Sequence, residues 1–254
     1  MTVRWVWVFL DLPQDDFERA VGFWRHVTGC RLSEFRGDRG QFATLLPARG
    51  DAWVKVQRVG GPGGIHVDLD VDVPLDRARD HVVSLGATVL DEVLDDDGTL
   101  GVVVCRSPGG FVFCLTRWQP GQAAQGQVRA GVPCLLDQVC LDIPRQRYAA
   151  ELDFWSALTG WAVRDGGRPE FRRIDGPSGS PVRFLLQRLG EERGEVRGHV
   201  DLACADVPGE VRRQVGLGAT EVGTGSGWVV MRDPTGAAYC CTGRDPLTGG
   251  RTEV

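Results

Sequence analysis

The sequence lacks the patterns that mark several common classes of protein. Its eight cysteines stand at irregular spacings without a C-x-x-C pair, which argues against a zinc knot or a disulfide framework and indicates free, mostly buried thiols. It has no excess of basic residues, because the net charge is −5 and the pI about 5.4, so we expect no nucleic-acid partner. The apolar start from Val3 to Leu10 is too short for a membrane span and lacks the features of a signal peptide. We therefore expect a cytoplasmic protein with no membrane partner.

What the sequence does contain is a long internal repeat. The chain carries FWRHVTGC at Phe23–Cys30 and FWSALTGW at Phe154–Trp161. It also carries GIHVDLDVDVP at Gly64–Pro74 and GHVDLACADVP at Gly198–Pro208, and the tetrapeptide LGAT occurs once in each copy. Landmarks that return in the same order at similar spacing mark a duplicated domain.

The domain bounds follow from this repeat and from composition. A chain of 254 residues is long enough for two domains that each bury a core. Residues Gln119–Gly131 are rich in Gln, Ala and Gly and have no apolar period, which is typical of a linker. We predict a first domain over residues 1–118, a linker over residues 119–131 and a second domain over residues 132–254.

Apolar residues at helical spacing occur at equivalent places in the two copies. In the first copy they are Phe17, Val21, Trp24 and Val27. Both stretches end at a glycine, Gly29 or Gly160. Each copy should therefore contain a helix with a buried face, on which Trp24 and Trp155 are core residues. A second helix is expected from Leu75 to Leu85, and its counterpart before Leu217 looks shorter.

The segment between these helices has two different faces. From His66 to Asp72 polar and apolar residues alternate, which is the period of a strand with one covered and one open face. His66 and Asp68 should project from the open face, with Asp70 as a further candidate. Runs of antiparallel strands with few helices predict an α+β fold with helices on one face of a curved sheet.

These features resemble the vicinal oxygen chelate superfamily, specifically its glyoxalase-like and bleomycin-resistance-like members. The resemblance is carried by Gly198–Cys240, by the helix end Phe154–Gly160 and by the opening Leu136–Pro144. It implies two tandem domains, each made of two βαβββ modules whose mixed sheet curls into a cup. It covers nearly the whole chain and is specific for the fold rather than for the reaction.

The resemblance also implies where a divalent metal ion would bind. Metal-dependent members hold it with a His or Gln on the first strand of a cup, a His on the fifth and a Glu on the last. The second half has Gln138, His199 and Cys240 at these positions. Zinc is the candidate ion there, because Cys and His are ordinary zinc ligands, but glutamine is a weak third partner and we favour no metal.

The first half departs further from that pattern. It has Trp7, His66 and Cys114 at the matching positions, and tryptophan cannot ligate a metal ion, so no metal is expected there. A large apolar ring in place of a metal ligand can form a surface for flat or apolar ligands. The alternative is that Trp7 fills the cup.

Without a metal, His66 and His199 have two interpretations. Asp68 or Asp201 lies two residues further on the same face of the strand, so each pair can act as an acid or base on the wall of a cup. Alternatively, each His bonds to the backbone and is structural.

Two cysteines are open to a similar choice. Cys114 and Cys240 are either nucleophiles or small core residues, and no neighbouring His or Lys in the sequence marks an activated thiolate. Cys241 follows Cys240, so one of the two should point into the cup and the other toward the helices.

Our first functional hypothesis is a metal-independent protein that binds a small organic molecule and sequesters or resists a toxic compound. The candidate ligand contacts are Trp7, Asp68, Cys114, Gln138, Trp228 and Cys240. The second hypothesis is a lyase, isomerase or dioxygenase that uses His199, Asp201 and His66, or a metal ion in the second half. The third is a scaffold with filled cups. Because single-domain relatives commonly pair, a fused tandem should be a monomer with an intrachain pseudo-dimer.

Overall fold

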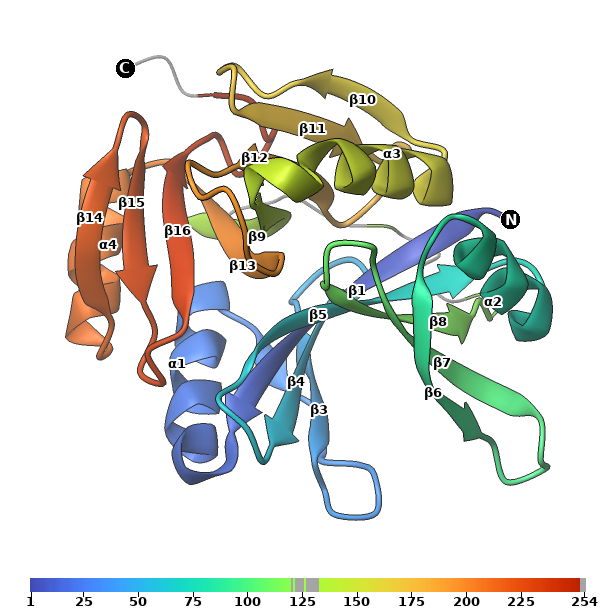
Figure 1. The fold of residues 1–254 in the computed structure, drawn as a ribbon. Coiled ribbons are helices and arrows are strands. Elements are labelled where there is room, and N and C mark those ends of the chain that lie inside the picture. The colour runs from blue at the N-terminus through green and yellow to red at the C-terminus, as the bar shows by residue number, and fades with distance from the viewer. Residues whose placement is uncertain (120, 122–125, 127–132, 252–254) are drawn as a thin grey trace. The chain divides into compact units, whose positions relative to one another are not determined.

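The computed structural model describes residues 1–119, 121, 126 and 133–251, whose strands form two open sheets (Figure 1). The predicted linker at 119–131 lies outside the described residues except for Gln119, Gly121 and Gly126. The first sheet has the strand order β2 (Arg31–Leu32), β3 (Phe42–Leu46), β4 (Val54–Val59), β1 (Val3–Pro13), β5 (Gly64–Val71), β8 (Val112–Arg117), β7 (Leu100–Arg106), β6 (Thr88–Leu94). The second has the order β10 (Ala162–Asp165), β11 (Phe171–Asp175), β12 (Arg183–Arg188), β9 (Cys134–Ile143), β13 (Arg197–Cys204), β16 (Ala238–Gly243), β15 (Trp228–Arg232), β14 (Thr220–Gly225).

Each half also contributes two α-helices and one short 3-10 turn to the described structure. They are η1 (Gln14–Asp16), α1 (Phe17–Thr28), α2 (Leu75–Ser84), η2 (Arg145–Arg147), α3 (Tyr148–Thr159) and α4 (Val207–Gly216). Both sheets are mixed, because β5 runs parallel to β8 and β13 runs parallel to β16, while the outer strand pairs are antiparallel. The predicted α+β fold with two tandem copies of a curled mixed sheet is confirmed.

The ends of the helices can be compared with those predicted from the repeat. Both α1 and α3 end at a glycine with a φ of 66°, Gly29 and Gly160, as predicted. The prediction of a shorter fourth helix is wrong, since α2 and α4 each have ten residues. The Asp206 side chain accepts a hydrogen bond from the Gly209 amide and caps α4, which begins at Val207.

The described chain folds into two compact units, and each unit takes segments from both halves of the sequence. The first unit contains Met1–Val8, His66–Ala124 and Cys140–Gly198, and the second contains Phe9–Ile65, Gln125–Val139 and His199–Val254. The repeat that is visible in the sequence therefore differs from the grouping of segments in space.

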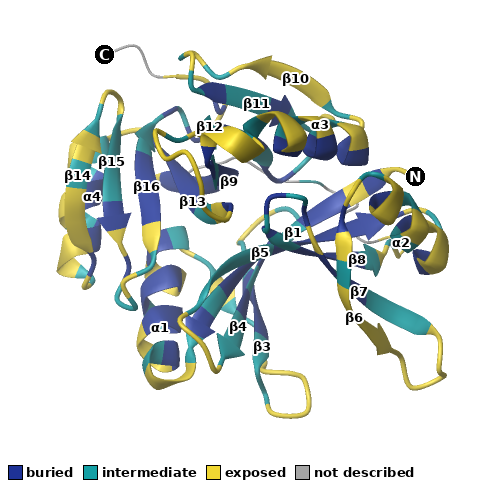
Figure 2. Ribbon diagram, in the orientation of Figure 1, coloured by how far each residue is buried: buried dark blue, intermediate teal, exposed yellow. Residues whose placement is uncertain are grey.

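Within each unit, a helix from one half packs on a strand from the other half. In the first unit, Phe154 and Trp155 of α3 pack on Phe113 of β8, with ring centroids 5.7 and 5.4 Å apart. In the second unit, Trp24 of α1 packs on Tyr239 of β16, with ring centroids 5.2 Å apart. The buried stripe on one side of each helix is visible in Figure 2. Trp24 and Trp155 are almost completely buried, so their prediction as core residues is confirmed.

The indole N–H groups of these two tryptophans are both bound to buried carboxylates, but the carboxylates come from different places. Trp24 donates to Asp233 in the turn before β16, over 3.0 Å. Trp155 donates to Glu151 on its own helix, over 2.8 Å. Ser107 occupies the position of Asp233 in the first half, and its hydroxyl accepts from the Phe111 amide instead.

Glu151 thus supplies the carboxylate that the turn at Ser107 lacks. Its second oxygen accepts a hydrogen bond from the Gly109 amide of that turn. The approach is so close that a Cβ atom at Gly109 would lie 2.8 Å from this oxygen and 2.4 Å from the Val196 side chain, so a larger residue here would have to displace Glu151 or Val196. Burial raises the pKa of Glu151, although its hydrogen bonds to Trp155 and Gly109 oppose the shift.

Two further expectations concern the whole chain. All eight cysteines are thiols, and all except Cys30 are buried, which confirms the prediction of free buried cysteines. Within the described residues, every helix is too short or too polar to cross a membrane.

Candidate functional site

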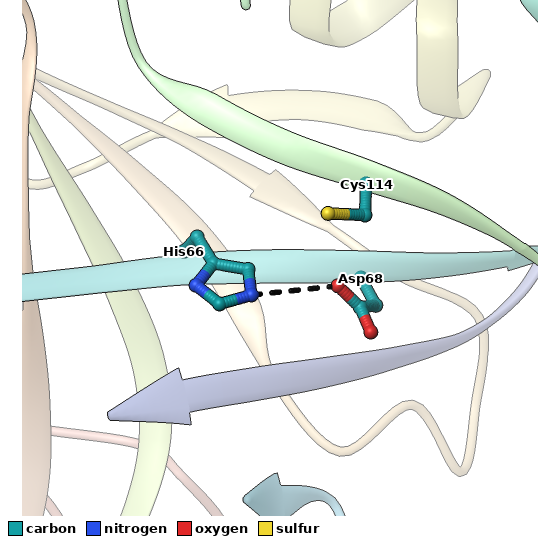
Figure 3. Close-up of side chains that lie close together, drawn as sticks. All are labelled: His66, Asp68 and Cys114. Atoms are coloured by element: carbon teal, nitrogen blue, oxygen red, sulfur yellow. Dashed lines mark ion pairs between the residues drawn. The ribbon is translucent and has the colours of Figure 1, made fainter. Parts of the chain in front are cut away.

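The first candidate site is a cluster of His66, Asp68 and Cys114, here called the first cluster. His66 and Asp68 alternate along β5, and Asp68 lies opposite Cys114 of the parallel strand β8, so the three side chains share one face of the sheet (Figure 3). His66 Nε2 lies 3.6 Å from Asp68 Oδ1, and the two side chains are only 12% and 10% exposed. One nitrogen, oxygen or sulfur atom of each residue lies within 4.8 Å of the others.

The same arrangement returns in the second half as the second cluster, His199, Asp201 and Cys240. Asp201 lies opposite Cys240 in the parallel pair of β13 and β16. His199 Nε2 lies 3.3 Å from Asp201 Oδ1 and 3.6 Å from Cys240 Sγ. The repeat thus preserves a His–Asp–Cys set, with the carboxylate and the thiol on the same side of the imidazole.

The electrostatics of the second cluster favour an ionised carboxylate. Burial by itself raises the pKa of Asp201, but His199, Arg244 and Gln138 together outweigh burial, and the pKa lies below the usual value of 3.8. Asp201 Oδ1 lies 3.3 Å from His199 Nε2 and so helps to fix the orientation of the imidazole ring. His199 Nε2 is therefore the atom that approaches both the Asp201 carboxylate and the Cys240 thiol.

In the first half, Trp7 is fixed by a hydrogen bond on the same face as the first cluster. Its indole N–H donates to Asp70 Oδ2 over 3.0 Å, and the Thr116 hydroxyl donates to Asp70 Oδ1 over 2.6 Å. Asp70 is 2% exposed and lies two residues beyond Asp68 on β5. Trp5 packs edge-on against Trp7, with ring centroids 6.4 Å apart. Two adjacent tryptophans therefore stand beside the cluster in a defined geometry.

In the second half, the residue at the position of Trp7 is engaged by a buried arginine. The Arg244 guanidinium donates to Gln138 Oε1 over 2.6 Å and also to Asp137 Oδ1. The amide nitrogen of Gln138 donates to Asp201 Oδ2. Arg244 is only 7% exposed, and Asp137 and Gln138 are buried as well. A continuous chain of contacts therefore runs from Arg244 through Gln138 and Asp201 to His199.

The two clusters offer a metal ion the same types of donor atom. Each cluster combines imidazole, carboxylate and thiol donors, which are types that zinc accepts. The first cluster differs from the predicted positions by including Asp68 in place of Trp7. In the second half, Gln138 presents its amide N–H to Asp201 and its oxygen to Arg244. Because an N–H group cannot ligate a cation, the predicted set of Gln138, His199 and Cys240 does not fit a metal ion in this arrangement.

The remaining predicted ligand residue, Trp228, lies on β15 opposite Thr242. Its ring covers Gly225, where a Cβ atom would come within 2.1 Å of the indole. Cys240 contacts His199, whereas the neighbouring Cys241 donates to Gln214 of α4, so the predicted division of the two cysteines between the faces is confirmed.

The sequence did not single out Asp137 or Arg244. Asp137 precedes Gln138 in β9, and a charged residue among apolar neighbours in a strand is a signal that could have identified it. Arg244 lies beyond the last landmark of the repeat, and nothing in its local sequence predicts burial of its charge.

Comparisons with known proteins agree with this architecture. A family model described as a glyoxalase-like domain matches residues 7–116 and 138–242. The sequence matches none of the curated proteins with which it was compared.

Solved structures share the fold at low sequence identity. A 2,2',3-trihydroxybiphenyl 1,2-dioxygenase from Sphingomonas wittichii strain RW1 is 15% identical with a TM-score of 0.61, over 95% of this chain and 90% of the other. A Mn(II)-bound glyoxalase from Novosphingobium aromaticivorans is 18% identical with a TM-score of 0.62, over 98% of this chain and 83% of the other. At such identities the likeness extends to the fold alone.

Proposed function

Since this chain belongs to the glyoxalase-like domain family, within the vicinal oxygen chelate superfamily, we propose that it binds a small organic molecule without a metal ion and so sequesters a toxic compound. The observation that carries the proposal is the hydrogen bond that fixes Trp7 on Asp70, at the position where metal-dependent relatives have a ligand. The residues that we expect to meet the molecule are those of the first cluster together with Trp7.

The chemistry of this face supports a flat, partly polar ligand. Trp7 supplies aromatic surface that stacks on planar groups, at little loss of conformational entropy because the buried Trp5 ring already packs against it. His66 and Asp68 supply a donor and an acceptor that fix the orientation of the molecule. Apolar area with a few convergent polar groups is the usual composition of a small-molecule site.

The test is a screen of planar aromatic compounds by tryptophan fluorescence and thermal shift, on protein dialysed against EDTA. We expect at least one compound to quench emission and raise the melting temperature, and Trp7→Phe to weaken its binding. Trp161→Phe is the matched control, since Trp161 lies in the same unit and packs on Phe184. Binding that disappears after EDTA treatment would contradict metal independence, and binding unaffected by Trp7→Phe would contradict the site.

A second candidate function is an acid–base enzyme of the lyase, isomerase or dioxygenase type in the second half. The observation that favours it is the position of His199 Nε2, within 3.3 Å of a buried carboxylate and 3.6 Å of a thiol. Such an imidazole holds a proton that it can transfer to or from a substrate.

Catalysis by the second cluster has its own test. His199→Ala should abolish any turnover found in a substrate screen while the circular dichroism spectrum stays unchanged, and His66→Ala in the first cluster is the matched control. Equal activity of His199→Ala and the unmodified protein would exclude this candidate.

A further inference from the structure

We propose that the buried Arg244 guanidinium supplies the positive charge that a divalent metal ion would supply in the second half, and that this site therefore binds no metal ion. The inference extends the metal-independent function proposed above and rests on it for its biological meaning. The contacts that support it lie in the second half, and none of them involves the ligand site proposed in the first half.

The first argument comes from charge. Asp137 and Asp201 are two carboxylates that are at most 3% exposed, and both lie within one hydrogen-bonded network. Buried carboxylates require a compensating cation. Arg244 provides it, by direct contact with Asp137 and through Gln138 to Asp201. A divalent ion would answer the same need in a metal-dependent relative.

The second argument comes from the orientation of Gln138. Guanidinium groups only donate and carboxylates only accept, so the amide oxygen must face Arg244 and the amide nitrogen must face Asp201. The one atom of Gln138 that can ligate a metal is thus bound to a permanent positive charge at 2.6 Å. An ion coordinated to this oxygen would lie next to the guanidinium and be repelled by it.

The third argument concerns the groups that would lose their cationic partner if Arg244 were removed. Gln138 and Asp137 would lose their cationic partner, beside an imidazole and a thiol that already contact each other at 3.6 Å. Oxygen, imidazole and thiolate donors together suit zinc and cobalt. Arg244 therefore separates a metal-free site from a metal site by a single side chain.

The experiment measures metal binding to Arg244→Met, which keeps most of the buried volume and removes the charge. All proteins carry His66→Ala, so that the first cluster cannot contribute a metal ion. The probe is Co²⁺, followed through its thiolate charge-transfer and d–d absorption, with stoichiometry measured by mass spectrometry after dialysis. We expect Arg244→Met to bind one equivalent at least roughly 100-fold more tightly than the parent, with loss of the band on Cys240→Ser.

Two further variants keep the test decisive. Arg244→Lys retains the charge and should bind no Co²⁺. If Arg244→Met does not fold, the double variant Asp137→Asn with Arg244→Gln preserves a neutral hydrogen-bonded pair and should gain the metal instead.

Two results would overturn the inference. One is a stoichiometric ion in the parent protein that is lost on His199→Ala, and the other is a folded, charge-free variant that binds no Co²⁺ at millimolar concentration. Failure of the Trp7-dependent ligand test would leave these outcomes unchanged, so the two proposals can fail separately.

Discussion

Glu151 offers the sharpest test of how segments from the two halves are held together. Its carboxylate accepts hydrogen bonds from the Gly109 amide in the first half and from the Trp155 indole on its own helix. Glu151 has no measurable exposure, so water cannot replace it as an acceptor. Glu151→Ala should therefore leave two buried N–H groups without partners.

The expected loss of stability follows from these two groups. A buried donor that loses its acceptor costs about 1–3 kcal/mol, so the loss of both hydrogen bonds should lower the free energy of unfolding by about 4 kcal/mol. For a chain of this size each kcal/mol lowers the melting temperature by about 2–4 °C, which predicts a decrease of roughly 12 °C. Glu151→Gln keeps one acceptor but turns an amide N–H₂ toward a donor, and it should have an intermediate effect.

The assay is urea unfolding followed by far-ultraviolet circular dichroism. Asp153→Ala is the matched control, since Asp153 is an exposed acidic residue on the same helix and its removal changes the net charge equally. A Glu151→Ala variant as stable as Asp153→Ala would refute the reasoning, because the buried N–H groups would then have found other partners.

The pH dependence of the same comparison has a definite sign. Burial raises the pKa of Glu151 in the folded state above 4.5, so the folded protein binds more protons than the unfolded chain in the interval above that value. Glu151 should therefore lower the stability progressively as the pH rises through this interval. The stability gap between the unmodified protein and Glu151→Gln, which does not titrate, should be larger at pH 4 than at pH 8.

Three other outcomes are expected. Asp233→Ala should lower the free energy of unfolding by about 2–4 kcal/mol in urea titrations, because the Trp24 indole and the Thr235 amide lose their acceptor, and an effect below 1 kcal/mol would contradict this account. The pKa of Asp201 lies below 3.8, so its stabilising contribution should be complete at neutral pH and should be lost as the pH falls through the lowered pKa. Asp201→Asn should abolish that part of the acid unfolding transition. An unchanged acid transition in this variant would argue against the network. Light scattering should give the monomer mass of 27.7 kDa, and twice that mass would exclude the predicted monomer.

Much of the fold could be predicted because its signals are local. The repeat places α1 and α3 at equivalent positions, and glycine at both C-caps marks where they end. Alternation along β5 also identified His66 and Asp68 as neighbours on one face. Such features depend on residues a few positions apart, and their periodicity is visible in the sequence.

The remainder depends on contacts between distant segments. Nothing near Glu151 indicates that its partner is Gly109, and the repeat gives alanine at the equivalent position, Ala20. Arg244 meets Gln138 across more than one hundred residues. The metal prediction for the second half considered ligand types only, and the orientation of the Gln138 amide could not be deduced without its two partners.

The exchange of helices between the halves has a consequence for dividing this protein. A cut in the segment between residues 118 and 133 would separate α1 from β16 and α3 from β8, and so interrupt the packing of Trp24 on Tyr239 and of Trp155 on Phe113. Each fragment would expose an aromatic surface that only the other fragment can cover. The two fragments should therefore restore each other's structure when mixed, which makes the chain a natural starting point for a split reporter.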